Sequence, residues 1–235
     1  MLFHLHAHGD PQGVSEIGRA LGLPKSSAHR LLAALRRREL VERDDSGRYR
    51  PGVALIGLAR GMLEREPLVA AARPILEQQA RSLGETFFLV AARGGRLIVL
   101  DKAEGTGVLR VAPQVGSAVP VHATAVGRLY MGFASDAVAL ERPLARFTRH
   151  TIVSVRRLRQ QADAARAAGS AVSRGEWQEG LCVFAAPVFE RERMLAAVCA
   201  AVPSMRLPRV DERAVLQRVT DAAARLGACL GGQRS

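Results

Sequence analysis

The stretch SEIGRALGLPKSSAHRLL, residues 15–32, decides how the first part of this 235-residue chain folds. Its first seven residues are typical of a short helix, with Ser15 as the expected N-cap and Gly22 just after the helix end. A second helix is expected after Pro24, from Lys25 to about Glu39. Two helices joined by a short turn that contains glycine form the helix-turn-helix pattern.

The second helix has one apolar and one polar face on a helical wheel. The apolar stripe that must be buried consists of Ala28, Leu31, Leu32 and Leu35. The opposite side carries Ser26, Arg30, Ala33 and Arg37, and no acidic residue occurs from Lys25 to Arg38. Such a face suits the major groove of DNA, whereas the alternative is an ordinary solvated basic face.

A hairpin is predicted directly after this helix, because Leu40–Arg43 and Arg48–Arg50 flank an Asp-Asp-Ser-Gly turn and Pro51-Gly52 ends the second strand. A hairpin in this position is a wing. Arg48 and Arg50 are expected to reach a phosphate backbone or a minor groove, and Tyr49 is expected to pack inward because strand residues alternate between faces.

The charge points toward an anionic partner without identifying it. There are 34 Lys and Arg residues against 22 Asp and Glu, a formal net charge of +12. Residues 1–60 contribute only +4 of this excess. Because Lys25 and Lys102 are the only lysines, a GC-rich coding bias is an alternative explanation of the excess. The pattern of the helix and wing therefore indicates DNA more strongly than the total does.

Composition excludes several classes of protein. The three cysteines show no CxxC spacing, which favours a reducing cytoplasm over a disulfide scaffold or a zinc site. No apolar run approaches the ~20 residues of a membrane span, and no signal peptide is evident. His4 and His8 have helical spacing but no third ligand nearby, so no metal and no cofactor are expected.

The rest of the chain predicts a linker helix and an α+β sheet domain. The segment from Val53 to Glu64 has too many apolar residues for one narrow stripe, which favours pairing with a second copy over simple capping of a domain. Pro67 breaks this helix, and the next helix is expected from Pro74 to Leu83. Hairpins are predicted over 86–101 and 181–202, with a further strand over Val108–Val111. The late strands are apolar on both faces and must lie between two layers.

Together these motifs resemble the IclR family of bacterial transcription regulators. The match rests on residues 15–32, on GRYR (47–50), on VHATAVGR (121–128) and on EGLCVFAAPV (179–188), in the family's order. The resemblance implies a winged helix-turn-helix DNA-binding domain (1–52), a linker and dimerisation helix (53–66) and a GAF-like effector-binding domain (67–235), an antiparallel sheet with flanking helices. It also implies a longer first helix than Leu2 to His8 provides, so an upstream start codon is expected.

The resemblance further implies a homodimer or dimer of dimers that binds a roughly palindromic double-stranded operator and responds to a small organic acid. The expected DNA-binding residues are Lys25, Ser26, Ser27, His29, Arg30, Arg37, Arg48 and Arg50. The expected effector-binding residues are Thr124, Ala125, Val126, Leu129, Ser173, Leu181, Val183, Cys199 and Ala201. Relatives that bind very small carboxylates tend to be more polar at three of these positions, so a bulkier effector such as an aromatic acid is expected. Arg128 stands where the family often has lysine.

Two alternatives remain open. A redox response through Cys182 or Cys199 would need an accessible thiol of low pKa, and a thiol enzyme would need Cys182 beside His122. No catalytic motif is present in the sequence, so an enzyme is not expected. Trp177, the single tryptophan, is interpreted as filling the core or as covering the pocket.

Overall fold

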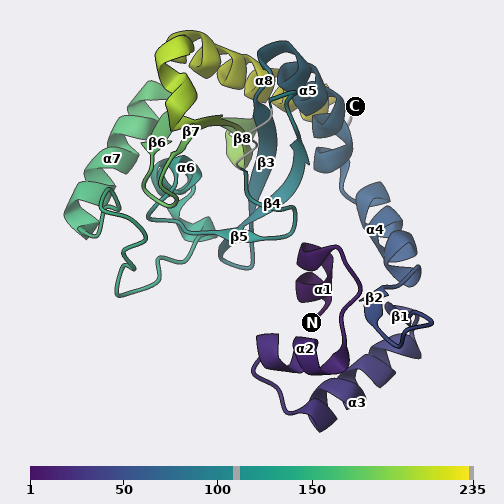
Figure 1. Cartoon of the computed structure of the whole chain (residues 1–235). Helices are drawn as coiled ribbons and strands as arrows, with labels where there is room; N and C mark the ends of the chain where they lie inside the picture. The colour runs from purple at the N-terminus through teal and green to yellow at the C-terminus, as the bar shows by residue number, and fades with distance from the viewer. Residues whose placement is uncertain (108–111, 233–235) are drawn as a thin grey trace. The chain divides into compact units, whose positions relative to one another are not determined.

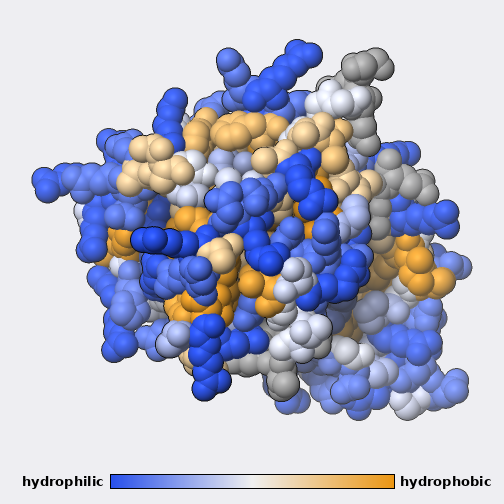
Figure 2. Space-filling model, turned by 90° about the horizontal axis from the view of Figure 1, so that it is seen from above, coloured by the Kyte–Doolittle hydropathy of each residue, from blue (hydrophilic) through white to orange (hydrophobic). Residues whose placement is uncertain are grey.

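The computed structural model describes residues 1–107 and 112–232 (Figure 1). The chain divides into two compact units, Met1–Glu66 and Pro67–Ser235. The strand expected over Val108–Val111 lies outside the described residues. No helix in the described part is long and apolar enough to cross a membrane. The face drawn in Figure 2 is mostly hydrophilic, with smaller hydrophobic areas between charged side chains.

The smaller unit is a helix-turn-helix followed by a two-stranded hairpin. Its elements are α1 (Leu2–His8), α2 (Val14–Ala20), α3 (Lys25–Arg36), β1 (Val41–Arg43), β2 (Tyr49–Pro51) and α4 (Ala54–Glu64). β1 and β2 are antiparallel, with Glu42 opposite Arg50. A small core holds α1, α2 and α3 against the hairpin, because one apolar side chain from each of these helices and from each strand is buried in it: Leu5, Ile17, Leu32, Val41 and Tyr49.

Three expectations for this unit are wrong in detail. Ser15 is not the N-cap of α2, because the helix begins at Val14 and Glu16 accepts a hydrogen bond from the Gly13 backbone N–H at 2.8 Å. α3 ends at Arg36, and Glu39 has a left-handed backbone with φ of 56° that no helix could continue through. Leu31 is 48% exposed, so the buried stripe is narrower than the wheel indicates.

The described residues of the larger unit form a six-stranded antiparallel sheet of order β5-β4-β3-β8-β7-β6. The strands are β3 (Thr86–Arg93), β4 (Arg96–Ala103), β5 (Ala118–Val119), β6 (Ala171–Arg174), β7 (Leu181–Glu190) and β8 (Arg193–Pro203). Both predicted hairpins are confirmed. The β3–β4 turn is made by Gly94 and Gly95, both with positive φ, which is the backbone that a two-residue hairpin loop requires.

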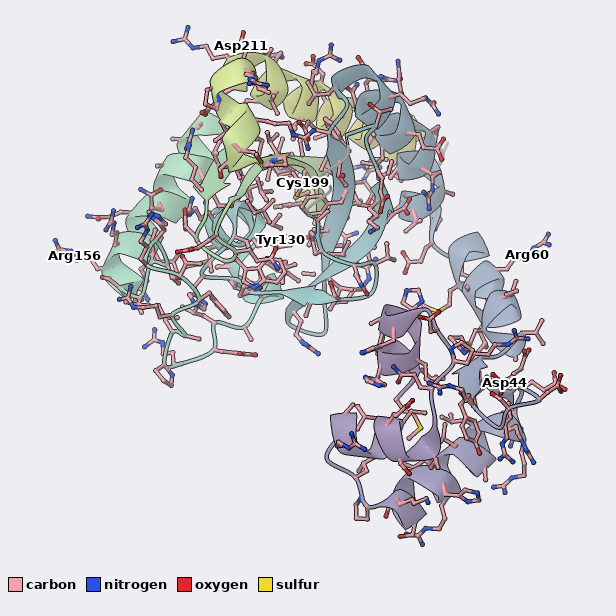
Figure 3. The ribbon with its side chains drawn as sticks, viewed as in Figure 1. Asp44, Arg60, Tyr130, Arg156, Cys199 and Asp211 are labelled. Carbon is pink, nitrogen blue, oxygen red and sulfur yellow. The ribbon has the colours of Figure 1, made fainter. Side chains whose placement is uncertain are left out.

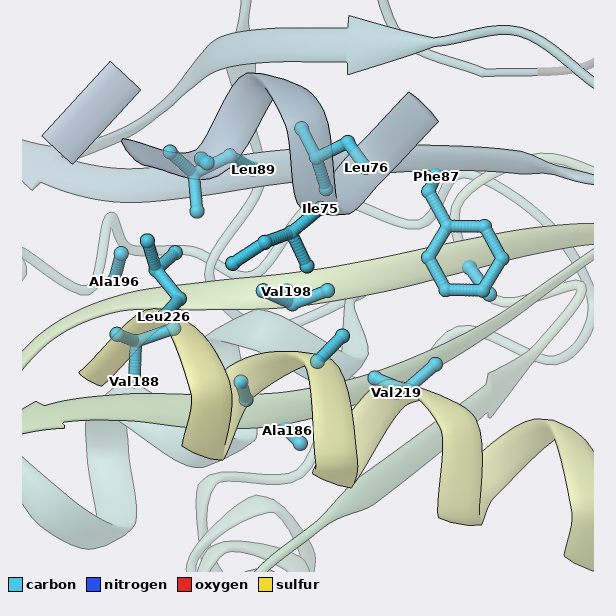
Figure 4. Packing of buried hydrophobic residues seen from close by; sticks show 14 of the residues in the cluster. Ile75, Leu76, Phe87, Leu89, Ala186, Val188, Ala196, Val198, Val219 and Leu226 are labelled. Carbon is cyan, nitrogen blue, oxygen red and sulfur yellow. The ribbon is translucent and has the colours of Figure 1, made fainter. Parts of the chain in front are cut away.

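Helices cover both faces of this sheet, as the apolar strands predict. α5 (Pro67–Leu83) and α8 (Glu212–Gly232) pack on one face, where Ile75, Leu76 and Leu226 meet Leu89 and Val198 (Figure 4). α6 (Ala125–Phe133) lies on the other face, and α7 (Val155–Ala168) packs against α6. Two short 3₁₀ helices cover Ser135–Ala137 and Ser204–Arg209. The helix expected from Pro74 instead begins at Pro67, and Pro74 lies inside it.

Tyr130 anchors α6 to the sheet. Its hydroxyl accepts a hydrogen bond from the Ala92 backbone N–H and donates one to the Leu195 carbonyl, each at 3.0 Å. These two groups lie just beyond Val90 and Ala197, the last paired residues of β3 and β8. The hydroxyl therefore satisfies backbone groups that the pairing between β3 and β8 does not reach. Burial raises the pKa of Tyr130 to about 12, which keeps this hydroxyl a donor. Tyr130 and Cys199 both lie in the interior of the unit (Figure 3).

Candidate nucleic-acid interface and small-molecule site

The polar face of α3 is exposed and strongly cationic. Ala28 and Leu32 are fully buried, and this fixes which face of the helix points outward. The exposed set consists of Lys25, Ser26, His29, Arg30 and Arg37, with Ser27 half-buried. Within the described residues, no carboxylate lies at ion-pair distance from Lys25, Arg30 or Arg37. These three charges are therefore available to an external anion.

The start of α3 is also available. Pro24 occupies its N-cap position, and no side chain of the described residues caps the helix. The first backbone N–H groups of a helix have no partner within it, and together with the helix dipole they attract phosphate. The hydroxyls of Ser26 and Ser27 lie in this first turn. A phosphate at this end of α3 would meet N–H groups, hydroxyls and Lys25 together.

The wing arginines are in a different state from those of α3. Tyr49 is 5% exposed, which confirms that it packs inward. Arg48 forms an ion pair with Glu16 at 3.0 Å and also donates to the Pro11 carbonyl at 2.7 Å. Arg50 forms an ion pair with Glu42 at 3.0 Å. Both arginines are exposed, but a phosphate would have to compete with a carboxylate for each of them.

The nine residues expected to bind an effector are all buried, and they come from α6 and the adjoining strands. The apolar members belong to one core layer between α6 and the sheet. Ser173 lies directly opposite Val183 on the neighbouring strand. Thr124 is the N-cap of α6, since its hydroxyl accepts from the Gly127 N–H at 3.1 Å and donates to the Pro120 carbonyl at 2.8 Å. Only Thr124 and Ser173 among the nine residues carry a hydroxyl group, and that of Ser173 is not engaged in a helix cap.

A buried ion pair beside these residues is a feature that sequence reasoning missed. Arg128 on α6 is 3% exposed and pairs with Glu176, and its Nη1 donates to the Val172 carbonyl at 2.6 Å. Its Nε is buried and has no hydrogen-bond partner in the part of the chain that the structure describes. Arginine at this position of the family motif was the only signal in the sequence. Nothing in the residue pattern connects it with Glu176, which is 48 positions away.

The cysteines do not form a reactive site in the described structure. Cys182 faces the α5/α8 layer and Cys199 faces the α6 layer, so they lie on opposite sides of the sheet. Burial raises the pKa of the Cys182 thiol, and it raises that of the fully buried Cys199 further. His122 precedes α6, on the side away from Cys182. A thiol pair between Cys182 and His122 is therefore contradicted.

The two histidines of α1 are engaged locally. Their rings are 4.2 Å apart, and His4 Nε2 lies 2.7 Å from the Gln12 side-chain oxygen. His8 Nδ1 lies 2.8 Å from the His4 carbonyl. Within the described ranges, no three His, Cys, Asp or Glu residues are grouped as metal ligands.

Comparison with known proteins covers both units. The family model for the bacterial transcriptional regulator IclR C-terminal domain matches residues 60–228, and that for the IclR helix-turn-helix domain matches residues 1–45. The chain is 32% identical over 209 residues to the probable transcriptional regulator SauR of Cupriavidus necator, covering 86% of this chain and 83% of that protein. It is 32% identical over 230 residues to the glycerol operon regulatory protein of Streptomyces griseus, covering 94% and 90%.

Solved structures agree with this assignment. An IclR homolog from Microbacterium hydrocarbonoxydans, crystallised with 4-hydroxybenzoate, superimposes with a TM-score of 0.79 at 25% identity, covering 94% of this chain and 92% of that one. The Thermotoga maritima IclR has the same fold, with a TM-score of 0.77 at 24% identity and coverage of 94% and 92%. The chain belongs to the IclR family and is a transcriptional regulator with a helix-turn-helix DNA-binding domain.

Proposed function

We propose that this regulator binds a specific operator through α3 and the wing, and that a small organic acid in the α6 core layer controls that binding. The observation that carries the DNA-binding role is the exposed α3 face, where Lys25, Arg30 and Arg37 have no carboxylate partner among the described residues. Guanidinium groups that no internal carboxylate holds can pair with guanine edges or phosphates without first breaking an ion pair.

The proposed DNA contacts are of two kinds: those that position the protein on the phosphate backbone and those that read base edges. Ser26, Ser27 and Lys25 lie at the start of α3 and suit the phosphate backbone, which fixes register but carries no sequence information. Arg30 and His29 follow in the next turn and suit base edges. Arg37, just beyond the helix end, suits a phosphate. Arg48 and Arg50 must release Glu16 and Glu42 before they can pair with phosphate. Their net contribution to the free energy of DNA binding is therefore smaller.

The proposed effector is an aromatic acid bound among the nine residues between α6 and the sheet. Two observations support this: the set is almost wholly apolar apart from Thr124 and Ser173, and the chain resembles a protein crystallised with 4-hydroxybenzoate. Apolar pockets with a few placed polar groups suit ligands of this kind. Ser173 and the backbone N–H groups at the start of α6 would supply the polar contacts.

Self-association is proposed through the segment 53–66, which would link a DNA-binding domain (1–52) to an effector-binding domain (67–235). Val53, Ile56, Leu58 and Met62 are 56 to 70% exposed. Apolar side chains exposed along one helix are typical of a surface that a partner covers. A second copy is the partner proposed, because a two-fold dimer matches a palindromic operator.

A gel shift on the DNA that flanks the protein's own gene tests the central proposal. We expect a discrete complex with this DNA, no comparable complex with scrambled DNA, and a change of affinity with one member of a panel of organic acids. Calorimetry then identifies the class of acid. Tight binding of glyoxylate or pyruvate, with none for aromatic acids, would show that the proposed effector class is wrong.

A thiol-based response is the weaker candidate. The two cysteines that could serve it, Cys182 and Cys199, are buried, and the pKa of each thiol is raised. Control of DNA binding by mild oxidants in the absence of any acid would favour it over the organic-acid proposal.

A further inference from the structure

A cavity of about 320 Å³ lies beside the nine proposed effector residues and includes none of them. Its walls come from the β3–β4 turn, from β5, from the segment before α6 and from two loops that follow. Three aromatic side chains line it: His122, Phe147 and Trp177. Its volume falls within the ~300–1,000 Å³ range of small-molecule sites.

Ring stacking and backbone hydrogen bonds join the segments that carry the aromatic side chains. The His122 ring stacks on Phe147 with centroids 5.5 Å apart and an interplanar angle of 27°. The Thr151 hydroxyl accepts from the Phe147 N–H at 3.0 Å and donates to the Glu176 carbonyl at 2.6 Å. It therefore joins the loop that carries Phe147 to the loop that carries Trp177. A site with walls fixed in this way loses little entropy when a ligand binds.

His122 offers one defined polar contact. The side chain is 6% exposed, and its Nε2 lies 2.8 Å from the Ala145 carbonyl. A carbonyl oxygen only accepts, so Nε2 must carry the proton, and in the neutral ring Nδ1 is then an acceptor. No group of the described residues hydrogen-bonds to Nδ1. A ligand hydroxyl can donate to it.

The charged residues of the lining set the charge of the ligand. Arg96, the first residue of β4, is exposed, and no carboxylate of the described chain lies at ion-pair distance from it. Arg96 can therefore pair with a ligand carboxylate. Glu141, the other charged residue of the lining, is also exposed and disfavours a second negative charge.

We propose that this cavity is a second small-molecule site, which binds a single-ring aromatic monocarboxylate that carries a hydroxyl group. The ring lies against Phe147 and Trp177, the carboxylate pairs with Arg96, and the hydroxyl donates to His122 Nδ1. This site is separate from the proposed effector pocket, and its occupancy requires neither DNA nor that pocket.

The test uses Trp177, which is the only tryptophan of the chain and lines the cavity. The full-length protein is titrated with 4-hydroxybenzoate while tryptophan fluorescence is followed, and free tryptophan amide corrects for absorption by the ligand. We expect a saturable change in fluorescence. Benzoate should bind more weakly because it lacks the hydroxyl, and cyclohexanecarboxylate more weakly still because its ring is saturated and has no aromatic face to stack on Phe147 and Trp177.

Two matched variants locate the ligand. Arg96→Gln should weaken the fluorescence-detected binding roughly 10-fold or more, because a charge-assisted hydrogen bond is lost. Arg93→Gln is the control, since Arg93 lies opposite Arg96 in the same hairpin and does not line the cavity. Both residues are exposed, so neither change should unfold the protein.

The effector-pocket variant Ser173→Ala separates this proposal from the earlier one. Binding that is lost in Arg96→Gln and retained in Ser173→Ala and Arg93→Gln supports the second site. No saturable signal, or a signal lost in Ser173→Ala and unchanged in Arg96→Gln, overturns it. A gel shift that responds to another acid would leave the proposed regulation standing even then.

Discussion

Arg128 carries a buried charge in the larger unit. Its side chain lies on α6 against Glu176, and among the described residues its Nε has no hydrogen-bond partner. Bringing two charges out of water is costly, and only their mutual attraction and hydrogen bonds offset that cost. Removal of either partner would leave the other charge buried and uncompensated.

Glu176→Gln should therefore lower the free energy of unfolding by about 3–5 kcal/mol. Arg174→Gln is the matched control, because Arg174 forms a solvent-exposed pair with Glu212 that should contribute about 0–1 kcal/mol. Urea denaturation measures both. The double variant Arg128→Met with Glu176→Leu should recover most of the loss, since apolar residues of similar size often replace a buried ion pair without cost. An equal effect of the two single variants would contradict this account.

Arg30 is predicted to read a base. Arg30→Ala should cost roughly 1–3 kcal/mol of operator affinity and relax the base preference at one position. Arg48→Ala should weaken binding less and uniformly across sequences, because Arg48 is paired with Glu16 and its proposed contact is with a phosphate. Binding to a set of single-base operator variants measures the difference. An equal loss from Arg30→Ala on every sequence would exclude its base-reading role.

The cysteines give a prediction for the native state. Burial raises the pKa of the thiols of Cys182 and Cys199, so the reactive thiolate is disfavoured at both while the protein is folded. Cys229 is exposed. At pH 8 a thiol reagent should modify one cysteine per native chain quickly and the other two only after unfolding. Rapid modification of two or three native thiols would instead indicate that the strands open.

At the scale of elements, the entry into α6 is the most constrained junction of the larger unit. A Cβ at Gly127 would lie 1.7 Å from the Val121 carbonyl oxygen, which is part of the backbone and has nowhere to move. Gly127 also donates its N–H to the Thr124 cap. The absence of a side chain at this position lets the chain turn tightly into the helix that carries Val126 and Leu129.

Gly127→Ala should therefore lower the free energy of unfolding by roughly 3 kcal/mol or more, in the range of the most damaging single substitutions. Gly231→Ala is the control, because Gly231 is exposed in the last turn of α8, outside the proposed interface, and an added Cβ would meet no described atom within 4 Å. There alanine should raise stability by up to about 0.5–1 kcal/mol through helix propensity. Thermal or urea unfolding of the two variants would contradict the account if both shifted in the same direction.

At the scale of the whole molecule, α4 exposes apolar side chains that a second copy of the chain is proposed to cover. Ile56 is 70% exposed and Met62 69%, each on a helix that also exposes Leu58. Covering such side chains in a dimer removes apolar area from water, and that gain drives association.

Ile56→Glu should shift the protein toward the monomer and weaken binding to a palindromic operator more than binding to a half-site. Met205→Glu is the matched control, because Met205 is 73% exposed in the larger unit and has no place in the proposed interface. Light scattering after gel filtration gives the oligomeric state of each variant. A dimer that survives Ile56→Glu and dissociates in Met205→Glu would place the interface elsewhere.

The sequence by itself determined the order of elements and most of their positions. Glycine turns, alternating strands and the apolar stripe of α3 depend on interactions over a few residues, so the sequence alone predicts them. The β3–β4 and β7–β8 hairpins, the inward Tyr49 and the cationic face of α3 all follow from such local patterns. The N-cap error was a choice between two local signals, since Glu16 rather than Ser15 satisfies the start of α2. The exposure of Leu31 depends instead on how α3 packs in the folded unit.

Only the tertiary structure decided which charges are available and which are engaged. Arg30 and Arg48 look alike in the sequence, yet one has no carboxylate nearby in the described chain and the other is paired with Glu16. Arg128 and Glu176 meet across 48 residues, and His122, Phe147 and Trp177 line one cavity from three separate segments. Electrostatic partners depend on distance in space, which the spacing of residues along a chain does not set.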